Sequence, residues 1–171
     1  MHKKASELLN TVGLSVSPKT RVAEIDIAGR QMIEIARAIA TNAKIIILDE
    51  PTSSLSDVEI KKLFETVNKL KKQGISFIFV SHRLQEVLTL SDRIYILKDG
   101  RLTKELYPEN TTEDEIVIYK LLSKTMLKPI SEVAPYAPFG KSKTTKLLKE
   151  MCQKGVITVE GKGKGTKYII S

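Results

Sequence analysis

Two carboxylates, Asp49 and Glu50, directly follow the apolar residues 45–48. A buried strand of this kind delivers polar side chains at its carboxyl end, where an open α/β sheet places its ligand. One carboxylate there can hold Mg²⁺ through water, and its neighbour can orient or deprotonate an attacking water. These residue types at this spacing favour nucleotide hydrolysis.

His82 follows a second apolar run, residues 75–80, by two positions. Its ring nitrogen could reach a terminal phosphate, charged or neutral depending on its partner. Each feature alone has an ordinary explanation, because an acidic pair at a strand end is often solvated and a single histidine is often structural. The joint spacing of the three residues favours the catalytic interpretation.

The phosphate-binding part of such a site is missing, because no GxxxxGK[ST] loop occurs in the 171 residues. The sequence therefore has the pattern of half an active site.

Alternating helical and strand patterns position these side chains. Apolar residues at helical spacing predict a helix over residues 31–40, and residues 44–48 predict a strand. A Ser-x-x-Glu capping box opens a predicted helix over residues 58–72, and residues 75–80 predict the next strand. Together they form one βαβ unit, which is typical of an α/β fold.

Beyond this unit, residues 84–90 predict a short helix. Residues 93–98 and 101–106 predict two strands joined by a tight Asp-Gly turn. A composition shift over residues 107–112 then separates this pattern from helices and a glycine-rich hairpin.

We therefore expect two domains, residues 1–108 and residues 112–171. In the second, a Thr-x-x-Glu capping box opens the first helix, residues 130–137 form a short second helix or turn, and residues 142–154 form the third helix. Two short strands at residues 156–160 and 166–170 complete it.

The first part resembles the ATP-binding-cassette (ABC) ATPases, most closely the cassettes of bacterial sugar importers of the ribose and galactoside type. The resemblance covers residues 5 to about 118 and is carried by IIILDEPTSSL and the later SHR. It implies that Asp49 is the Walker B aspartate, which holds Mg²⁺ through water, and that Glu50 is the catalytic glutamate. It also implies that His82 is the switch histidine and that Ser54 and Leu55 belong to the D-loop.

The signature segment departs from the family pattern, since LSGGQ in most cassettes reads IDIAG over residues 25–29 here. The resemblance implies that Gly29 and Gln31 contact the nucleotide, as Asp49 and Ser54 do. Asp26 stands where the family has a serine that meets a phosphate of the partner's ATP. We expect Asp26 instead to cap its helix and to stabilise it by roughly 0.5–2 kcal/mol relative to alanine. Its carboxylate would, however, repel phosphate.

The resemblance further implies ATP and Mg²⁺ as cofactors, and a membrane permease and a second cassette as partners. The family's first half, with its base-stacking aromatic, Walker A loop and glutamine loop, is not in this sequence. Without that nest of backbone N–H groups we expect very weak ATP binding and no hydrolysis by this chain alone. A separate chain could supply the missing half. The absent Walker A strand also leaves a gap in the family's sheet, between the strands at residues 75–80 and 93–98.

Residues 112–171 resemble a winged helix-turn-helix of small bacterial transcription regulators, through KGVI and GKGKGTKY. The expected fold class is thus α/β, a partial P-loop NTPase sheet lacking the Walker A half, with a small C-terminal winged-helix domain. In helix-turn-helix proteins a recognition helix enters the major groove. The resemblance implies contacts to double-stranded DNA from the start of the third helix and from the wing, at Lys141, Ser142, Lys143, Thr145, Lys146, Lys162 and Lys164. The alternative is a domain that mediates only protein contacts and whose lysines are solvated.

The charge is consistent with a polyanionic partner. The net charge is +8, and the last 33 residues hold eight lysines against Glu150 and Glu160, a net of +6. Residues 112–171 contain no arginine that could read guanine through two hydrogen bonds, so we expect phosphate contacts to dominate any DNA binding.

The sequence contains no apolar stretch of about 18 residues and no secretory signal. We expect a cytoplasmic chain with no membrane insertion, peripheral at the inner face of the cell membrane where it meets a permease.

The leading interpretation is a partial ATP-binding component related to sugar importers, joined to a DNA-binding winged helix. The alternative is a non-enzymatic DNA-binding or protein-interaction module in which the cassette half serves as scaffold or dimerisation surface. A third interpretation is a truncated or artificially joined chain whose other half lies on a separate polypeptide.

Overall fold

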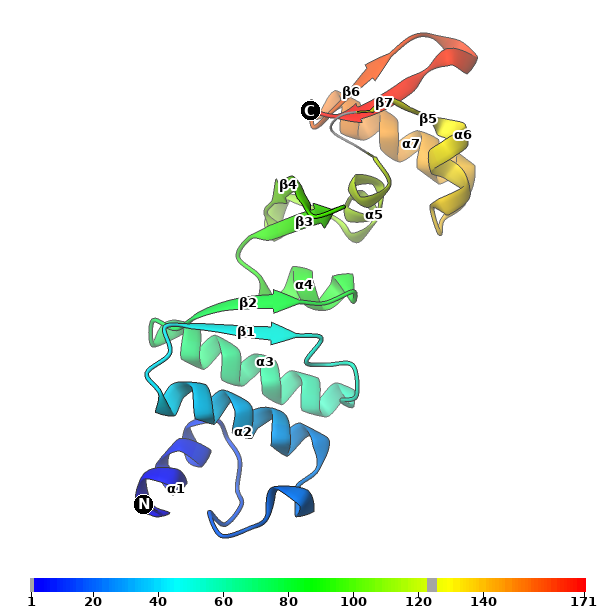
Figure 1. Cartoon of the computed structure of the whole chain (residues 1–171). Coiled ribbons are helices and arrows are strands. Elements are labelled where there is room, and N and C mark those ends of the chain that lie inside the picture. Colours follow the sequence, from blue (N-terminus) through cyan, green and yellow to red (C-terminus); the bar gives the residue numbers. More distant parts are fainter. Residues whose placement is uncertain (1, 123–125) are drawn as a thin grey trace. The chain divides into compact units, whose positions relative to one another are not determined.

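The computed structural model describes residues 2–122 and 126–171, apart from the side chain of Lys164. The chain divides into two compact units, Met1–Arg83 and Leu84–Ser171, which are described separately (Figure 1). Among the described residues no helix is both long and apolar enough to cross a bilayer.

Unit 1 is a two-stranded parallel sheet with helices on one face. It contains α1 (His2–Thr11), α2 (Ile27–Ala40), β1 (Ile45–Asp49), α3 (Asp57–Lys72) and β2 (Ser76–Val80), with a 3₁₀ turn at Val22–Glu24. The two strands pair in parallel along their whole length, and α2 and α3 lie on the same side of them (Figure 1). Ile46 and Leu48 of β1 are buried on that side, as is Leu63 of α3. This confirms the predicted βαβ unit.

The predicted capping box is formed, and α3 begins at Asp57, one residue before the predicted start. The backbone N–H of Ser56 donates to Glu59 Oε2 at 2.7 Å, and the Ser56 hydroxyl donates to the same oxygen at 2.6 Å. The first of these bonds satisfies the N–H of the N-cap residue, one of the backbone donors that a helix start otherwise leaves without a partner.

Helix α2 begins four residues earlier than its apolar spacing predicted, because Asp26 caps it. Asp26 Oδ1 accepts a hydrogen bond of 2.7 Å from the backbone N–H of Gly29, which confirms the expected capping role. Gly29 is buried against this cap. A methyl group at this position would clash with Ile25 Cγ2 and would lie 2.9 Å from Asp26 Oδ1. Glycine is therefore required here by the close approach of the preceding loop.

Unit 2 begins with α4 (Leu84–Leu90) and an antiparallel hairpin, β3 (Ile94–Lys98) with β4 (Arg101–Leu106). Asp99 and Gly100 at the turn have φ angles of 51° and 72°, as a type I′ hairpin turn requires. The hairpin and its turn confirm the sequence prediction.

The rest of unit 2 is a helical segment closed by a small sheet. Its elements are α5 (Glu113–Leu121), β5 (Lys128–Pro129), α6 (Ile130–Val133), α7 (Gly140–Gln153), β6 (Ile157–Glu160) and β7 (Lys167–Ile170), with 3₁₀ turns at Pro108–Asn110, Ala134–Tyr136 and Gly163–Gly165. The strand order is β5-β7-β6, antiparallel throughout. Strand β5 has no counterpart in the sequence prediction, because two residues are too few to show a period.

The units divide between Arg83 and Leu84, earlier than the composition shift at residues 107–112 suggests. The reason is a shared core, in which Ile96 of β3 and Leu106 of β4 join a single cluster with residues of α5, α7 and β7. Lys98 Nζ strengthens the connection, since it donates to the carbonyl oxygens of Lys120 at 3.0 Å and Leu122 at 3.1 Å. The hairpin that the sequence assigns to the first domain thus packs into unit 2.

Replacing Gly29 by alanine should lower the free energy of unfolding of unit 1 by about 1–2 kcal/mol, because the clash outweighs the better helix propensity of alanine. Replacing Asp26 by alanine should cost about 0.5–2 kcal/mol through loss of the cap. In urea denaturation the double variant should lose less than the sum, since both changes act on one cap. Strict additivity would show that Gly29 and Asp26 are independent.

A second prediction concerns Glu115, which joins α5 to α7. Its Oε1 accepts a hydrogen bond of 2.6 Å from Lys154 Nζ, and its Oε2 accepts one of 2.9 Å from the Thr112 N–H. Burial raises the pKa of Glu115, but the hydrogen bonds and the charge of Lys154 outweigh burial, so its pKa is lowered. Its contribution to stability is therefore complete at neutral pH and disappears as the pH falls through this lowered pKa.

Glu115→Gln should lower the free energy of unfolding at pH 7 by about 1–2 kcal/mol, and the difference from the parent chain should shrink in acid, below about pH 4. The control is Glu150→Gln, whose exposed pair with Lys146 spans 3.8 Å and should matter by less than about 0.5 kcal/mol. If Glu115→Gln lowered the free energy of unfolding by the same amount at every pH, the ion pair with Lys154 would be excluded as the cause of the loss.

Candidate functional site

Parallel pairing brings the predicted catalytic residues to one edge of unit 1. In the register Asp49 lies opposite Val80, so both strands end together. The backbone N–H of Glu50 donates to the Val80 carbonyl oxygen at 2.9 Å and continues the ladder by one residue. Asp49 and Glu50 from β1 and His82 from the end of β2 therefore lie at the carboxyl end of the sheet.

Glu50 and His82 are in direct contact. His82 Nδ1 lies 2.8 Å from Glu50 Oε2, and the side chains are 73% and 36% exposed. Because a carboxylate only accepts hydrogen bonds, Nδ1 carries the proton in this contact, and Nε2 of a neutral ring is left to accept from another group. Glu50 also has a φ of 45°, in the left-handed region that non-glycine residues seldom adopt. Such strain often marks functional positions.

Asp49 differs from Glu50 in the face that it occupies. Ile45, Ile47 and Asp49 alternate with the buried Ile46 and Leu48, so Asp49 belongs to the sheet face that the helices of unit 1 leave open. An exposed carboxylate at a strand end has the hard oxygen atoms that Mg²⁺ prefers. No group of three or more metal-ligating side chains occurs among the described residues, so Asp49 would share the ion with water and substrate oxygens.

The other predicted nucleotide contacts lie elsewhere in unit 1. Ser54 is exposed on the turn after Thr52, which is buried. Gly29 is buried and Gln31 is half-buried on the first turn of α2. The N–H of Gly29 is already used by the Asp26 cap, so this helix start does not present that N–H to an anion.

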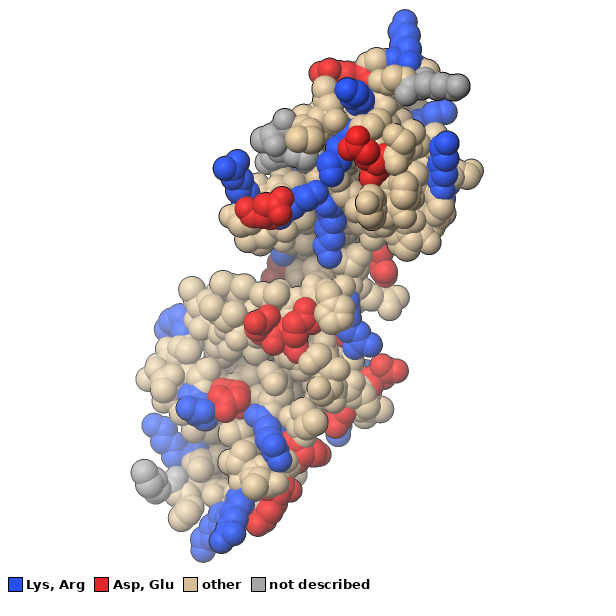
Figure 2. Space-filling model, turned by 45° about the vertical axis from the view of Figure 1, so that its right-hand side comes forward, with Lys and Arg blue, Asp and Glu red and all other residues tan. Residues whose placement is uncertain are grey.

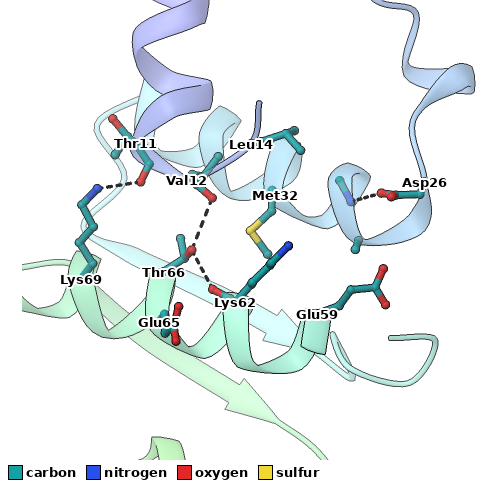
Figure 3. A pocket seen from close by; sticks show the side chains of 13 residues that line it. Thr11, Val12, Leu14, Asp26, Met32, Glu59, Lys62, Glu65, Thr66 and Lys69 are labelled. Carbon is teal, nitrogen blue, oxygen red and sulfur yellow. Dashed lines mark hydrogen bonds between the residues drawn. The ribbon is translucent and has the colours of Figure 1, made fainter. Parts of the chain in front are cut away.

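A separate cavity of about 430 Å³ lies between the end of α1, the start of α2 and one side of α3 (Figure 3). The Thr66 hydroxyl lies 2.9 Å from the Lys62 carbonyl and 3.4 Å from the Val12 carbonyl, and Lys69 Nζ donates to the Thr11 carbonyl at 3.3 Å. These hydrogen bonds fix the end of α1 to α3. The lining carries both signs of charge and includes none of Asp49, Glu50 and His82. This cavity is therefore separate from the candidate site at the carboxyl end of the sheet.

In unit 2 the predicted DNA contacts on α7 have different surroundings. Lys141, Ser142 and Lys146 are exposed, and Thr145 is half-buried with its hydroxyl donating to the Lys141 carbonyl at 2.8 Å. Lys143 instead forms an ion pair with Asp114 of α5, and its Nζ lies 4.9 Å from the centre of the Phe139 ring. Lys143 is therefore engaged by an acidic and an aromatic side chain of its own unit, although its side chain is still 54% exposed.

On the hairpin that follows α7, Lys162 is exposed, whereas the side chain of Lys164 lies outside the described residues. Lys149 and Gln153, which the sequence prediction omitted, are exposed and share the outer face of α7 with Ser142 and Lys146. Helical spacing could have found them, because these positions recur every three or four residues. On the face shown in Figure 2, basic side chains (Lys and Arg) and acidic side chains (Asp and Glu) are interspersed.

Known proteins resemble the first part of the chain. Residues 1–53 match the family model described as ABC transporter. Over 117 residues, 68% of this chain, it is 44% identical to the ribose import ATP-binding protein RbsA 1 of Streptomyces avermitilis and covers 22% of that protein. The match to the galactose/methyl galactoside import ATP-binding protein MglA 1 of Photobacterium profundum is also 44% identical over 68% of this chain, and covers 24% of the relative. The chain thus spans less than a quarter of the curated relatives that it matches.

Solved structures agree with these relatives. A nucleotide-free ATP-binding cassette from an ABC transporter superposes with a TM-score of 0.57 at 30% identity, over 61% of this chain and 42% of the cassette. The dimeric cassette MJ0796 in a post-hydrolysis state bound to ADP and Pi gives a TM-score of 0.54 at 29% identity, over 62% of this chain and 46% of the cassette. The matched part of the chain is therefore a partial ATP-binding cassette of the ABC transporter type, close to the ribose and galactoside import ATPases.

Proposed function

We propose that unit 1 contributes the side chains that hold Mg²⁺ and activate water in an ATPase that powers sugar import. A second polypeptide unit would supply the phosphate-binding loop. The observation that carries this proposal is the Glu50–His82 contact of 2.8 Å at the strand edge where Asp49 also ends. Similarity to the ribose and galactoside import proteins supports the transport context.

The residues present fit Mg²⁺ better than they fit the whole nucleotide. Asp49 offers an exposed carboxylate for a water-bound Mg²⁺, which when bound would neutralise charge on the phosphate oxygens. Glu50 would orient the attacking water and accept its proton. His82, which donates to Glu50 through Nδ1, would direct Nε2 toward the terminal phosphate and would donate to it in the doubly protonated, cationic form of the ring. Nothing in the sequence replaces the backbone N–H nest of a GxxxxGK[ST] loop.

The transport context also implies where the chain acts. We propose that it works in the cytoplasm, peripheral at the inner face of the membrane, with a membrane permease and a second cassette. The absence of a membrane-spanning helix among the described residues is compatible with this role.

The full chain alone should release phosphate from ATP at background rate. Addition of a cassette fragment that contains a GxxxxGK[ST] loop with its strand and helix, taken from the ribose import relative, should restore hydrolysis. Glu50→Gln should lower the restored rate by about 10²-fold or more, because the general base is lost. Glu7→Gln, an exposed position on α1, is the matched control. Turnover by the chain alone that Glu50→Gln abolishes would contradict the need for the fragment, and a restored rate indifferent to Glu50→Gln would refute its catalytic role.

A second candidate function, binding of double-stranded DNA by unit 2, is favoured by a separate observation. After α5, the order α6, α7 and the β6–β7 hairpin agrees with that of a winged helix-turn-helix, and the outer face of α7 carries Lys146 and Lys149. With Lys143 held by Asp114, the other lysines of α7 and those of the hairpin would provide phosphate contacts rather than base reading. The competing interpretation of this surface is a protein-interaction module.

Each phosphate contact contributes about −0.9 to the slope of log affinity against log salt, so replacing Lys162 and Lys164 by alanine should flatten the slope of the full chain by roughly two units. Fluorescence anisotropy with a labelled duplex measures it. The control is the replacement of Lys3 and Lys4 on α1 by alanine, which removes the same charge from unit 1 and should leave the slope unchanged. An unaltered slope would remove the hairpin from the proposal, and absence of binding at low salt would favour the interaction module.

A further inference from the structure

The first turn of α5 contacts α7 through two neighbouring carboxylates. Asp114 forms an ion pair with Lys143, near the start of α7, and Glu115 forms one with Lys154, directly after its end. The two lysines are eleven positions apart in the sequence, which corresponds to about 16 Å of helix rise. Adjacent carboxylates of α5 therefore bind lysines at opposite ends of the helix that would enter the major groove.

The two ion pairs differ in their surroundings. Glu115 is buried and also closes the capping box of α5, so its contact with Lys154 contributes to the packing of the unit. The side chains of Asp114 and Lys143 are 36% and 54% exposed. An ion pair with this exposure contributes little to stability, because water and salt screen it. Stability alone therefore explains Asp114 poorly.

Lys143 lies beside the outer face of α7. Lys146 is exposed on that face, and residues three positions apart are neighbours on a helix surface. A helix in the major groove has the phosphate backbones of the DNA along its flanks. A lysine on such a flank could bind a phosphate, provided that no other group holds its ammonium.

Two groups of unit 2 hold the ammonium of Lys143. The Asp114 carboxylate pairs with it, and Nζ lies 4.9 Å from the centre of the Phe139 ring. A phosphate would have to compete with both contacts, and the negative charge of Asp114 would also repel it. Asp114 is the stronger of the two competitors, because it neutralises the charge that a phosphate would need.

We propose that Asp114 limits the DNA affinity of unit 2 by withholding Lys143 from the phosphate backbone. This inference rests on the proposed DNA binding and names a residue outside α7 and the hairpin that regulates it. Removal of the Asp114 charge frees Lys143, which then adds one phosphate contact to those of the other lysines. Asp114 therefore sets the strength and the salt dependence of binding, and not the base sequence that is bound.

The test compares two carboxylates on the first turn of α5. Asp114→Asn and the control Glu113→Gln, at an exposed position one residue earlier, remove the same charge from the full chain. Fluorescence anisotropy measures affinity for a labelled duplex between about 50 and 200 mM salt. Asp114→Asn should steepen the slope of log affinity against log salt by about 0.9 more than Glu113→Gln does, and should raise affinity at about 0.1 M salt by roughly three- to tenfold more.

Substitution of the lysine identifies the group that is released. Lys143→Ala should cancel the added slope when it is combined with Asp114→Asn, whereas in the parent chain it should change the slope much less. Asp114→Ser is a second variant that removes the same charge with a different side chain. Circular dichroism verifies that each variant folds.

The outcomes separate this inference from DNA binding itself. If the parent chain binds and the Asp114 and Glu113 variants share one slope, the inference is overturned and the DNA-binding proposal stands. A slope flattened by about 0.9 on Lys143→Ala in the parent chain also overturns it, because Lys143 then contacts phosphate in spite of the ion pair. Binding by the Asp114→Asn chain alone supports the inference and refutes DNA binding by the parent chain, whereas binding by neither overturns both.

Discussion

The parallel pairing of β1 with β2 is the interaction on which the rest of unit 1 depends. Its register sets Asp49 opposite Val80, and the N–H of Glu50 extends the ladder to the Val80 carbonyl at 2.9 Å. Without this pairing, residues 32 positions apart would have no reason to meet, yet Glu50 and His82 are in contact. The same pairing leaves one apolar face bare, so the feature that assembles the catalytic edge also makes unit 1 incomplete. A half-covered parallel sheet is best understood as one part of a larger α/β fold.

The β3–β4 hairpin, which the sequence analysis assigned to the first domain, packs into the hydrophobic core of unit 2. The inward residues of β3 and β4 share a cluster with α5, α7 and β7. Two lysines add polar contacts, since Lys98 Nζ binds the carbonyl oxygens at the end of α5 and Lys104 Nζ binds the Ser171 carbonyl at 3.1 Å. Burial lowers the pKa of Lys98, yet its carbonyl partners provide hydrogen bonds at that position. The hairpin therefore belongs physically to the C-terminal unit, whatever the origin of its sequence.

Local side-chain chemistry explains why much of this fold could be predicted. The Ser56–Glu59 and Thr112–Glu115 capping boxes are formed as their spacing indicates, and the Asp99–Gly100 turn joins β3 to β4. All three depend on residues within a few positions of one another. The boundary between the two units could not be predicted in this way, because a composition shift reports local polarity and carries no information about which strands share a core.

The sequence by itself determined the residue types of the candidate site, since an acidic pair and a histidine each follow an apolar strand, and it determined that no phosphate loop accompanies them. It also determined most of the order of helices and strands, with α1 and β5 as exceptions, because caps, turns and periodicity are local. Only the tertiary structure decided that Glu50 meets His82, that Lys143 turns to Asp114, and that Gly29 is needed for close packing against Ile25. Those outcomes depend on strand register and on contacts between elements distant in sequence, which no local pattern encodes.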